Sequence, residues 1–149
     1  MSTGKLCNRD VVIVRRDSSV QEAAQLMRTH HVGDLVVVEE RDGERVPVGI
    51  ITDRDIVVEV IAKNVELGAV SIGDVMSFEL VTVNEDDDIF DTVKLMRTKG
   101  VRRVPVVDKH GVLVGILTVD DLVDALGELM ADVTGVILRE QKREQRTRP

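Results

Sequence analysis

The chain has 149 residues, a formal net charge of −7 at neutral pH and 43% hydrophobic residues. This length allows one compact domain with a real core, or two very small, intertwined units. The acidic balance argues against a nucleic-acid binder that relies on phosphate contacts, and the absence of Trp and Tyr removes the platforms on which single-stranded bases stack. No apolar run approaches the roughly 20 residues that span a bilayer.

The first ten residues, MSTGKLCNRD, contain no apolar segment of the kind that marks a chain for export. Cys7 is the single cysteine, so no internal disulfide can form, which fits a reducing compartment. We therefore expect a cytoplasmic protein without membrane or nucleic-acid partners.

An internal repeat organises the sequence. The segment that starts at Leu6 aligns without a gap on the segment that starts at Val75, and LMRT recurs intact in both. After three extra residues in the first copy, GIITDRD at 49–55 matches GILTVDD at 115–121. We therefore predict four parts: a first repeat at 6–63, a connector at 64–74, a second repeat at 75–131, and a C-terminal helix with a basic tail at 132–149.

Each repeat predicts the order strand, helix, strand, strand, helix. The β-branched runs VVIV and LVTV predict the opening strands. Ser19-x-x-Glu22 and Asp88-x-x-Asp91 are helix starts of the capping-box type. LVVV and VPVV predict the next strands, which short turns connect to VPVGII and VLVGIL as hairpins.

Thr52 and Thr118 then begin the closing helices. One unit alone is too small to cover both its sheet and its helices, whereas two units packed about a pseudo-twofold axis cover each other. We therefore expect an α/β protein, an α+β sandwich of two β-α-β-β-α repeats, with two equivalent clefts between them.

The recurring Thr-x-x-Asp motif allows two interpretations. Thr at the N-cap with an acid three residues later is nearly a capping box, and Asp in the first turn suits the helix dipole, so no ligand is needed. In both copies, however, the motif lies where a buried strand ends and a helix begins, which is where an α/β layer places a ligand. There Thr offers a hydroxyl and Asp offers two acceptors suited to a ribose diol.

Taken together, these features resemble a tandem pair of CBS (cystathionine β-synthase) domains, or Bateman module. The resemblance covers about residues 6–130 and rests on GIITDRD, GILTVDD, LMRT, RRVPVVD and VSIGDVMS, in order and in duplicate. It implies a regulatory sensor that is not an enzyme and requires no cofactor. Its possible ligands are AMP, ADP, ATP or S-adenosylmethionine, and it would signal to a regulated protein whose identity is unknown.

The resemblance also implies roles for individual residues. Each Thr-x-x-Asp motif would hold ribose hydroxyls, aliphatic residues of the preceding strand would flank the base, and Arg102 and Arg103 would make forked contacts with phosphate, with Arg54 nearby. The implied nucleotide-binding residues are Ile51, Thr52, Arg54, Asp55, Arg102, Arg103, Val104, Pro105, Leu117, Thr118 and Asp121.

The first copy departs from this pattern because it has Gly33 and Asp34 where the second has the two arginines. An acid at that place would repel phosphate, so we expect the two clefts to bind unequally. The sequence does not indicate which Thr-x-x-Asp motif each arginine serves. The other interpretation of Arg102 and Arg103 is a solvated strand edge.

Other chemistry finds little support in the sequence. The three histidines lack metal-ligand spacing, no catalytic set can be assembled, and NEDDD at 84–88 could hold a hard cation but suits a turn and a helix cap. The main alternative to a sensor is a structural or interaction module that dimerises and docks a partner without binding a ligand.

The closing helices predict association. The segment DIVVEVIA is apolar on more than one face, whereas a surface helix needs only one apolar stripe. We therefore expect a homodimer held mainly by residues 56–62 and 122–130. The segment after 131 is either a longer helix with a solvated end or a docking segment for a partner.

Overall fold

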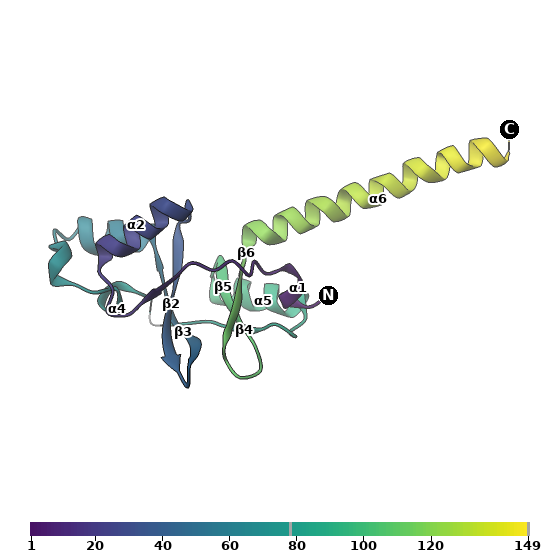
Figure 1. Ribbon diagram of the computed structural model, residues 1–149. Helices are drawn as coiled ribbons and strands as arrows, with labels where there is room; N and C mark the ends of the chain where they lie inside the picture. Colours follow the sequence, from purple (N-terminus) through teal and green to yellow (C-terminus); the bar gives the residue numbers. More distant parts are fainter. Residues whose placement is uncertain (78, 149) are drawn as a thin grey trace.

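The computed structural model, which describes residues 1–77 and 79–148, contains two three-stranded sheets (Figure 1). In each sheet the first strand runs parallel to the second, which is antiparallel to the third. The strands are β1 (Ile13–Arg15), β2 (Asp34–Arg41) and β3 (Glu44–Thr52) in the first sheet, and β4 (Val83–Asn84), β5 (Arg103–Val107) and β6 (Leu113–Thr118) in the second. The predicted duplicated α/β organisation is confirmed.

A helix joins the two parallel strands of each sheet: α2 (Val20–His30) in the first unit and α5 (Ile89–Lys99) in the second. Ser19 Oγ accepts the backbone N–H of Glu22, whose carboxylate accepts the backbone N–H of Ser19, so the predicted capping box is confirmed. Asp88 caps α5 through its side chain.

The closing helices differ in length. After β3 the chain enters α3 (Asp53–Asp55), which continues as the π-helix η1 (Ile56–Ile61). After β6 it enters α6 (Val119–Thr147), which projects away from the two sheets (Figure 1). The residues predicted as a C-terminal helix and tail therefore continue the closing helix of the second repeat without a break as far as Thr147.

The segment that precedes each repeat packs on the opposite unit. The short helix α1 (Thr3–Leu6) contacts the second unit, where Thr3 N–H donates to the Asp87 carbonyl at 2.8 Å. The equivalent helix α4 (Ile72–Val75), which follows the short 3-10 helix η2 (Leu67–Ala69), contacts the first unit. Each unit is thus completed by a segment that lies next to the other repeat in the sequence.

This exchange explains the glycine that opens both recurring motifs. A Cβ at Gly49 would lie 2.6 Å from Met76 Sδ, and a Cβ at Gly115 would lie 2.6 Å from Cys7 Sγ. Both distances are far below van der Waals contact. The segments that contain Met76 and Cys7 can therefore pack against these strands only because glycine has no side chain.

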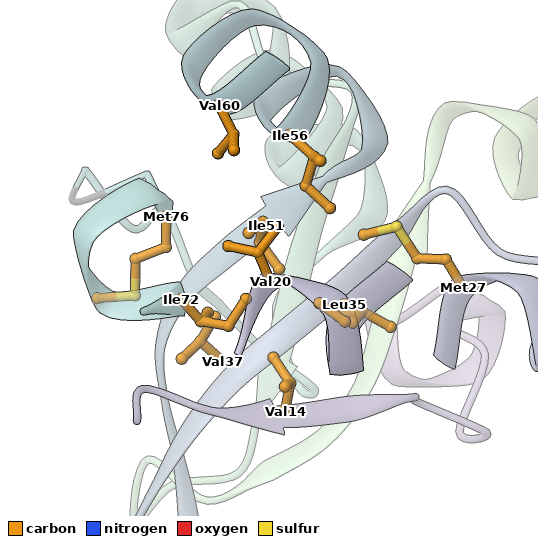
Figure 2. Packing of buried hydrophobic residues seen from close by; sticks show 11 residues of the cluster. Val14, Val20, Met27, Leu35, Val37, Ile51, Ile56, Val60, Ile72 and Met76 are labelled. Carbon is orange, nitrogen blue, oxygen red and sulfur yellow. The ribbon is translucent and has the colours of Figure 1, made fainter. Parts of the chain in front are cut away.

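Three apolar clusters hold the fold together. The first lies between the first sheet and its helices, and Figure 2 shows Ile51 among its members. The second is the equivalent cluster of the second unit, which contains Leu117. The third joins the two units and consists of Val36, Val38 and Ile116, with Val11, Ile13 and Leu113 packed against them. Within the described part of the chain, no helix combines the length and apolar character that crossing a membrane requires.

Candidate functional site

The first cleft is a cavity of about 310 Å³ at the end of β3. One side is formed by the first Thr-x-x-Asp motif and the strand before it, and the other by the start of β5. Its lining residues are Ile50, Thr52, Asp53, Arg54, Ser77, Glu79, Leu80, Val81, Val101, Arg102 and Arg103. Residues predicted for ribose and for phosphate therefore share one cavity, although they come from opposite repeats.

The second cleft is a cavity of about 210 Å³ at the end of β6. Its lining residues are Asn8, Asp10, Val11, Val12, Val32, Asp34, Ile116, Thr118 and Asp121. Three of these are acids, and no Arg or Lys appears among the lining residues that the structure describes. The two clefts occupy corresponding positions in the duplicated fold but carry different charge.

The location of the clefts resolves a point that the sequence left open. Arg102 and Arg103 lie with Thr52 in the first cleft, whereas Thr118 and Asp121 lie with Asp34 in the second. Both arginines therefore line the cleft that holds the motif of the first repeat, although Arg102 Nη2 also lies 3.9 Å from Asp120 Oδ1 of the motif that follows it in the chain.

Both Thr-x-x-Asp motifs form complete capping boxes. Thr52 Oγ1 accepts the Asp55 backbone N–H at 3.1 Å, and Asp55 Oδ2 accepts the Thr52 backbone N–H at 2.9 Å. Thr118 and Asp121 make the same pair of bonds at 3.2 and 2.8 Å. The capping bonds use Oδ2 of each carboxylate, so each motif builds the start of a helix at the edge of its cleft.

An ion pair crosses between the two clefts. Arg103 Nη1 lies 3.2 Å from Asp34 Oδ1, and the two side chains are only 28% and 20% exposed. Burial raises the pKa of Asp34; the Arg103 guanidinium opposes this shift, and the nearby Asp53 carboxylate adds to it. Asp34 therefore neutralises the guanidinium that faces the first cleft, which the sequence analysis did not anticipate.

Arg102 is in a different environment. Its side chain is 72% exposed, and its Nη2 lies 3.9 Å from Asp120 Oδ1, a distance typical of a weak surface pair. Arg54 and Arg102 line the first cleft together with Arg103, so three arginine residues border one cavity. The alternative interpretation, a solvated strand edge, accounts for the exposure of Arg102 but not for the partly buried position of Arg103.

Ile51 and Leu117 do not flank either cleft, contrary to the expectation. Both are fully buried in the two cores, and the preceding residues Ile50 and Ile116 line the clefts instead. Successive side chains of a strand point to opposite faces, so the assignment was displaced by one residue. Val104 is likewise fully buried in the second core.

Two further assignments change in detail. Pro105 is buried on β5, pairing with Ile116 of β6, and it does not line the first cleft. Asp55 holds the helix cap beside that cleft, whose wall is formed by the adjacent Asp53.

Sequence reasoning missed the lining residues contributed by the exchanged segments. Asn8, Asp10, Val11 and Val12 line the second cleft, and Ser77 with Glu79 to Val81 line the first. No local pattern marks these residues, because their position depends on which unit the preceding segment packs against. By contrast, Ile50 and Ile116 could have been found from the two-residue period of the strands.

The other candidate sites have structural explanations. In the NEDDD segment, Asp87 Oδ2 accepts the Asn84 backbone N–H at 2.8 Å and Asp88 caps α5. In the described ranges, 1–77 and 79–148, no cluster of three or more His, Cys, Asp or Glu side chains is arranged to hold a metal ion.

Comparisons with known proteins agree with this architecture. The CBS domain family model matches residues 4–62 and again 72–128. The chain is 38% identical over 133 residues to the uncharacterized protein MK0525 of Methanopyrus kandleri, and the match covers 89% of this chain and 66% of that protein.

Two solved structures share the fold. One is the CBS domain pair of protein MJ0100 in complex with 5-methylthioadenosine and S-adenosyl-L-methionine, with a TM-score of 0.74, 26% identity, and coverage of 86% of this chain and 97% of that one. The other is the CBS domain protein PAE2072 of Pyrobaculum aerophilum complexed with AMP, with a TM-score of 0.73, 27% identity, and coverage of 82% and 90%. Two family matches in tandem, on two units that complete one another, show that this chain belongs to the CBS domain family as a CBS domain pair.

Proposed function

We propose that this chain is a regulatory module that binds an adenine nucleotide or a related adenosyl ligand in the first cleft and transmits the bound state to a partner protein. The observation that carries the proposal is the convergence of Thr52 with Arg54, Arg102 and Arg103 on one cavity. A nucleotide needs an apolar surface for its base, hydrogen-bonding groups for its ribose and cations for its phosphates.

The first cleft supplies all three kinds of group. Ile50, Leu80 and Val81 are apolar, the Thr52 motif offers hydroxyl and carboxylate oxygens, and the guanidinium groups suit phosphate oxygens through forked hydrogen bonds. The adenosine-containing ligands of the two related structures support the same ligand class.

The first cleft contains groups for binding rather than for bond cleavage. Its phosphate-facing residues are cations, its lining acids are Asp53 and Glu79, and the nearby Asp55 carboxylate is engaged in the helix cap. We therefore expect no turnover of ATP or ADP, because the described lining of this cleft holds no histidine and its cations would bind phosphate without activating a water molecule. Sustained ATP hydrolysis that survives repeated purification, measured as phosphate release, would contradict a purely regulatory role.

A second candidate function is that of an interaction module with no ligand. The Arg103–Asp34 pair favours it, because the Asp34 carboxylate balances the charge of the Arg103 guanidinium without a phosphate. Exposed apolar residues on η1, including Val57 and Ile61, and on α6 also favour association. We propose that the module acts as a homodimer in either case, with the closing helices at its interface.

A ligand panel distinguishes the two functions. Calorimetry with AMP, ADP, ATP, S-adenosylmethionine, GMP and ribose 5-phosphate should show saturable binding of at least one adenosine compound and weaker binding of GMP. Native mass spectrometry of the purified chain would reveal a ligand outside this panel. If no compound binds in calorimetry and the purified chain carries none, the interaction module is the correct function.

A further inference from the structure

Most of the large apolar side chains of α6 are exposed in the part of the chain that the structure describes. The helix projects beyond the second unit (Figure 1), and its main contacts are with β6 and α1 near its start. The exposed large apolar residues along it are Val123, Leu126, Leu129, Met130, Val133, Val136, Ile137 and Leu138, each at least 50% exposed. Apolar exposure over several turns marks an interaction surface.

The spacing of these residues is that of a helix that packs along another helix. Intervals of four and three residues separate Leu122, Leu126, Leu129, Val133 and Val136, which places them at the a and d positions of a heptad. A third row recurs every seven residues at the e position and consists of Val123, Met130 and Ile137. Leu138 lies outside the stripe. The stripe extends about 23 Å at 1.5 Å per residue.

The charges on α6 are divided between its two halves. Residues 119–132 contain five acids and no base, whereas residues 139–148 contain five bases and two acids. The dipole of the helix favours such charges only in its first and last turns, and Glu128, Asp132 and Arg139 lie well inside the helix. Two copies in antiparallel orientation would set the acidic half of each against the basic half of the other, whereas parallel copies would align like charges.

The e row leads to the same orientation. In a parallel pair, e residues face the g residues of the other helix, which here are Ala125, Asp132 and Arg139. In an antiparallel pair, e residues face e residues. With a twofold axis at Met130, Val123 of one copy meets Ile137 of the other.

The same register also pairs the residues at the a and d positions, which form the seam between the two helices. Leu126 of one copy then packs against Val136 of the other, and Leu129 packs against Val133. Beyond the seam, Arg139 lies beside the first turns of the opposing α6, where the acidic residues Asp120 and Asp121 are found. Apolar contacts and charges are thus satisfied by one arrangement.

We propose that α6 pairs with α6 of a second copy of this chain as an antiparallel two-helix coil centred on Met130. Pairing through α6 is independent of nucleotide binding. It extends the proposed association by assigning its orientation and register, and it is separable from any contact made by η1.

Two neighbouring substitutions test the seam. Val133→Asp places a charge in the apolar stripe, and Thr134→Asp places the same charge one residue away at a solvent-facing b position. Sedimentation velocity should show that Val133→Asp weakens dimerisation at least a hundredfold, while Thr134→Asp changes it less than threefold. Circular dichroism verifies that both variants retain the fold. Because the antiparallel pair opposes unlike charges, 0.5 M salt should weaken the dimer of the unmodified chain.

Single cysteines test the orientation. Met130→Cys should form an interchain disulfide rapidly, because residue 130 faces its own copy across the axis, whereas Leu126→Cys should not. The unmodified chain, which carries only Cys7, gives the background. The proposal is overturned if the unmodified chain is a monomer at about 100 µM, if Val133→Asp and Thr134→Asp dimerise equally, or if Leu126→Cys links faster than Met130→Cys. A dimer that survives Val133→Asp but is lost in Val57→Glu would support association through η1 and reject pairing through α6.

Discussion

The two clefts are built from equivalent parts of one duplicated unit, yet one gathers arginines and the other gathers acids. Both have a Thr-x-x-Asp capping box at the start of a helix and an isoleucine on the preceding strand. They differ where the opposite unit begins its second strand, because Arg102 and Arg103 stand there for the first cleft and Gly33 and Asp34 for the second. Two residues at a strand entry, together with Arg54 in the first cleft and Asp10 in the second, therefore give the two clefts different charges within one fold.

The Arg103–Asp34 pair also shows that the clefts are not independent. Asp34 lines the second cleft and Arg103 lines the first. A phosphate that binds Arg103 would therefore break the ion pair and leave the negative charge of Asp34 without a partner. Changing these residues one at a time tests how the two clefts differ.

The largest expected effect comes from removing both arginines of the first cleft. A hydrogen bond to a charged group contributes roughly 1.5 to 3 kcal/mol, so each lost arginine should weaken nucleotide binding about tenfold to a hundredfold. Arg102→Ala/Arg103→Ala should therefore reduce the affinity at least a hundredfold in calorimetry. Lys109→Ala, which removes a cation from the distant hairpin of the second unit, serves as the control. Normal binding by the double variant would show that these arginines do not hold phosphate.

The next largest effect is a difference between equivalent substitutions in the two Thr-x-x-Asp motifs. Asp55→Ala and Asp121→Ala each remove one capping box, so each should lower the free energy of unfolding by about 1 kcal/mol. Only Asp55→Ala should weaken binding at the tighter site, by about tenfold, because the first motif shares its cleft with the arginines. Chemical denaturation measures the shared effect, and calorimetry measures the difference. A greater loss of binding in Asp121→Ala would reverse the assignment of the clefts.

A smaller effect of opposite sign is expected from Asp34→Asn. This change removes the carboxylate that competes with phosphate for Arg103, and a partly buried ion pair of this kind contributes up to about 1 kcal/mol. Affinity for a phosphorylated ligand should therefore rise about fivefold, whereas affinity for adenosine should not change. A weaker phosphorylated complex in Asp34→Asn would mean that the carboxylate positions Arg103 instead of competing for the ligand.

The smallest expected effect is a pH dependence. Burial already raises the pKa of Asp34, and loss of Arg103 to a phosphate removes the influence that opposes that shift. The pKa of Asp34 in the bound state is then higher than in the free state, so binding takes up a proton and affinity rises as pH falls through that interval. Asp34→Asn should lose this component and retain only the titration of the phosphate. Identical pH profiles for the two chains would show that Asp34 is not linked to binding.

Local sequence patterns were sufficient for most of the fold. The capping residues Ser19, Thr52 and Thr118, the hairpins and the repeat itself follow from local hydrogen bonding and from periodicity, which act over a few residues. The exchange of α1 and α4 between units did not follow, because it depends on contacts between residues about 80 positions apart, such as Thr3 and Asp87. The Arg103–Asp34 pair and the lining residues near Asn8 and Ser77 likewise depend on contacts beyond the range of local patterns.

The central claim is that the clefts bind unequally, and titration of the unmodified chain with AMP to saturation tests it most directly. Calorimetry, with sites counted by native mass spectrometry, should give one tight site per chain and a second site at least tenfold weaker or not detectable. The tight site should be the one weakened by Arg103→Ala. Two sites of equal affinity, or a tight site that is indifferent to Arg103, would contradict the account.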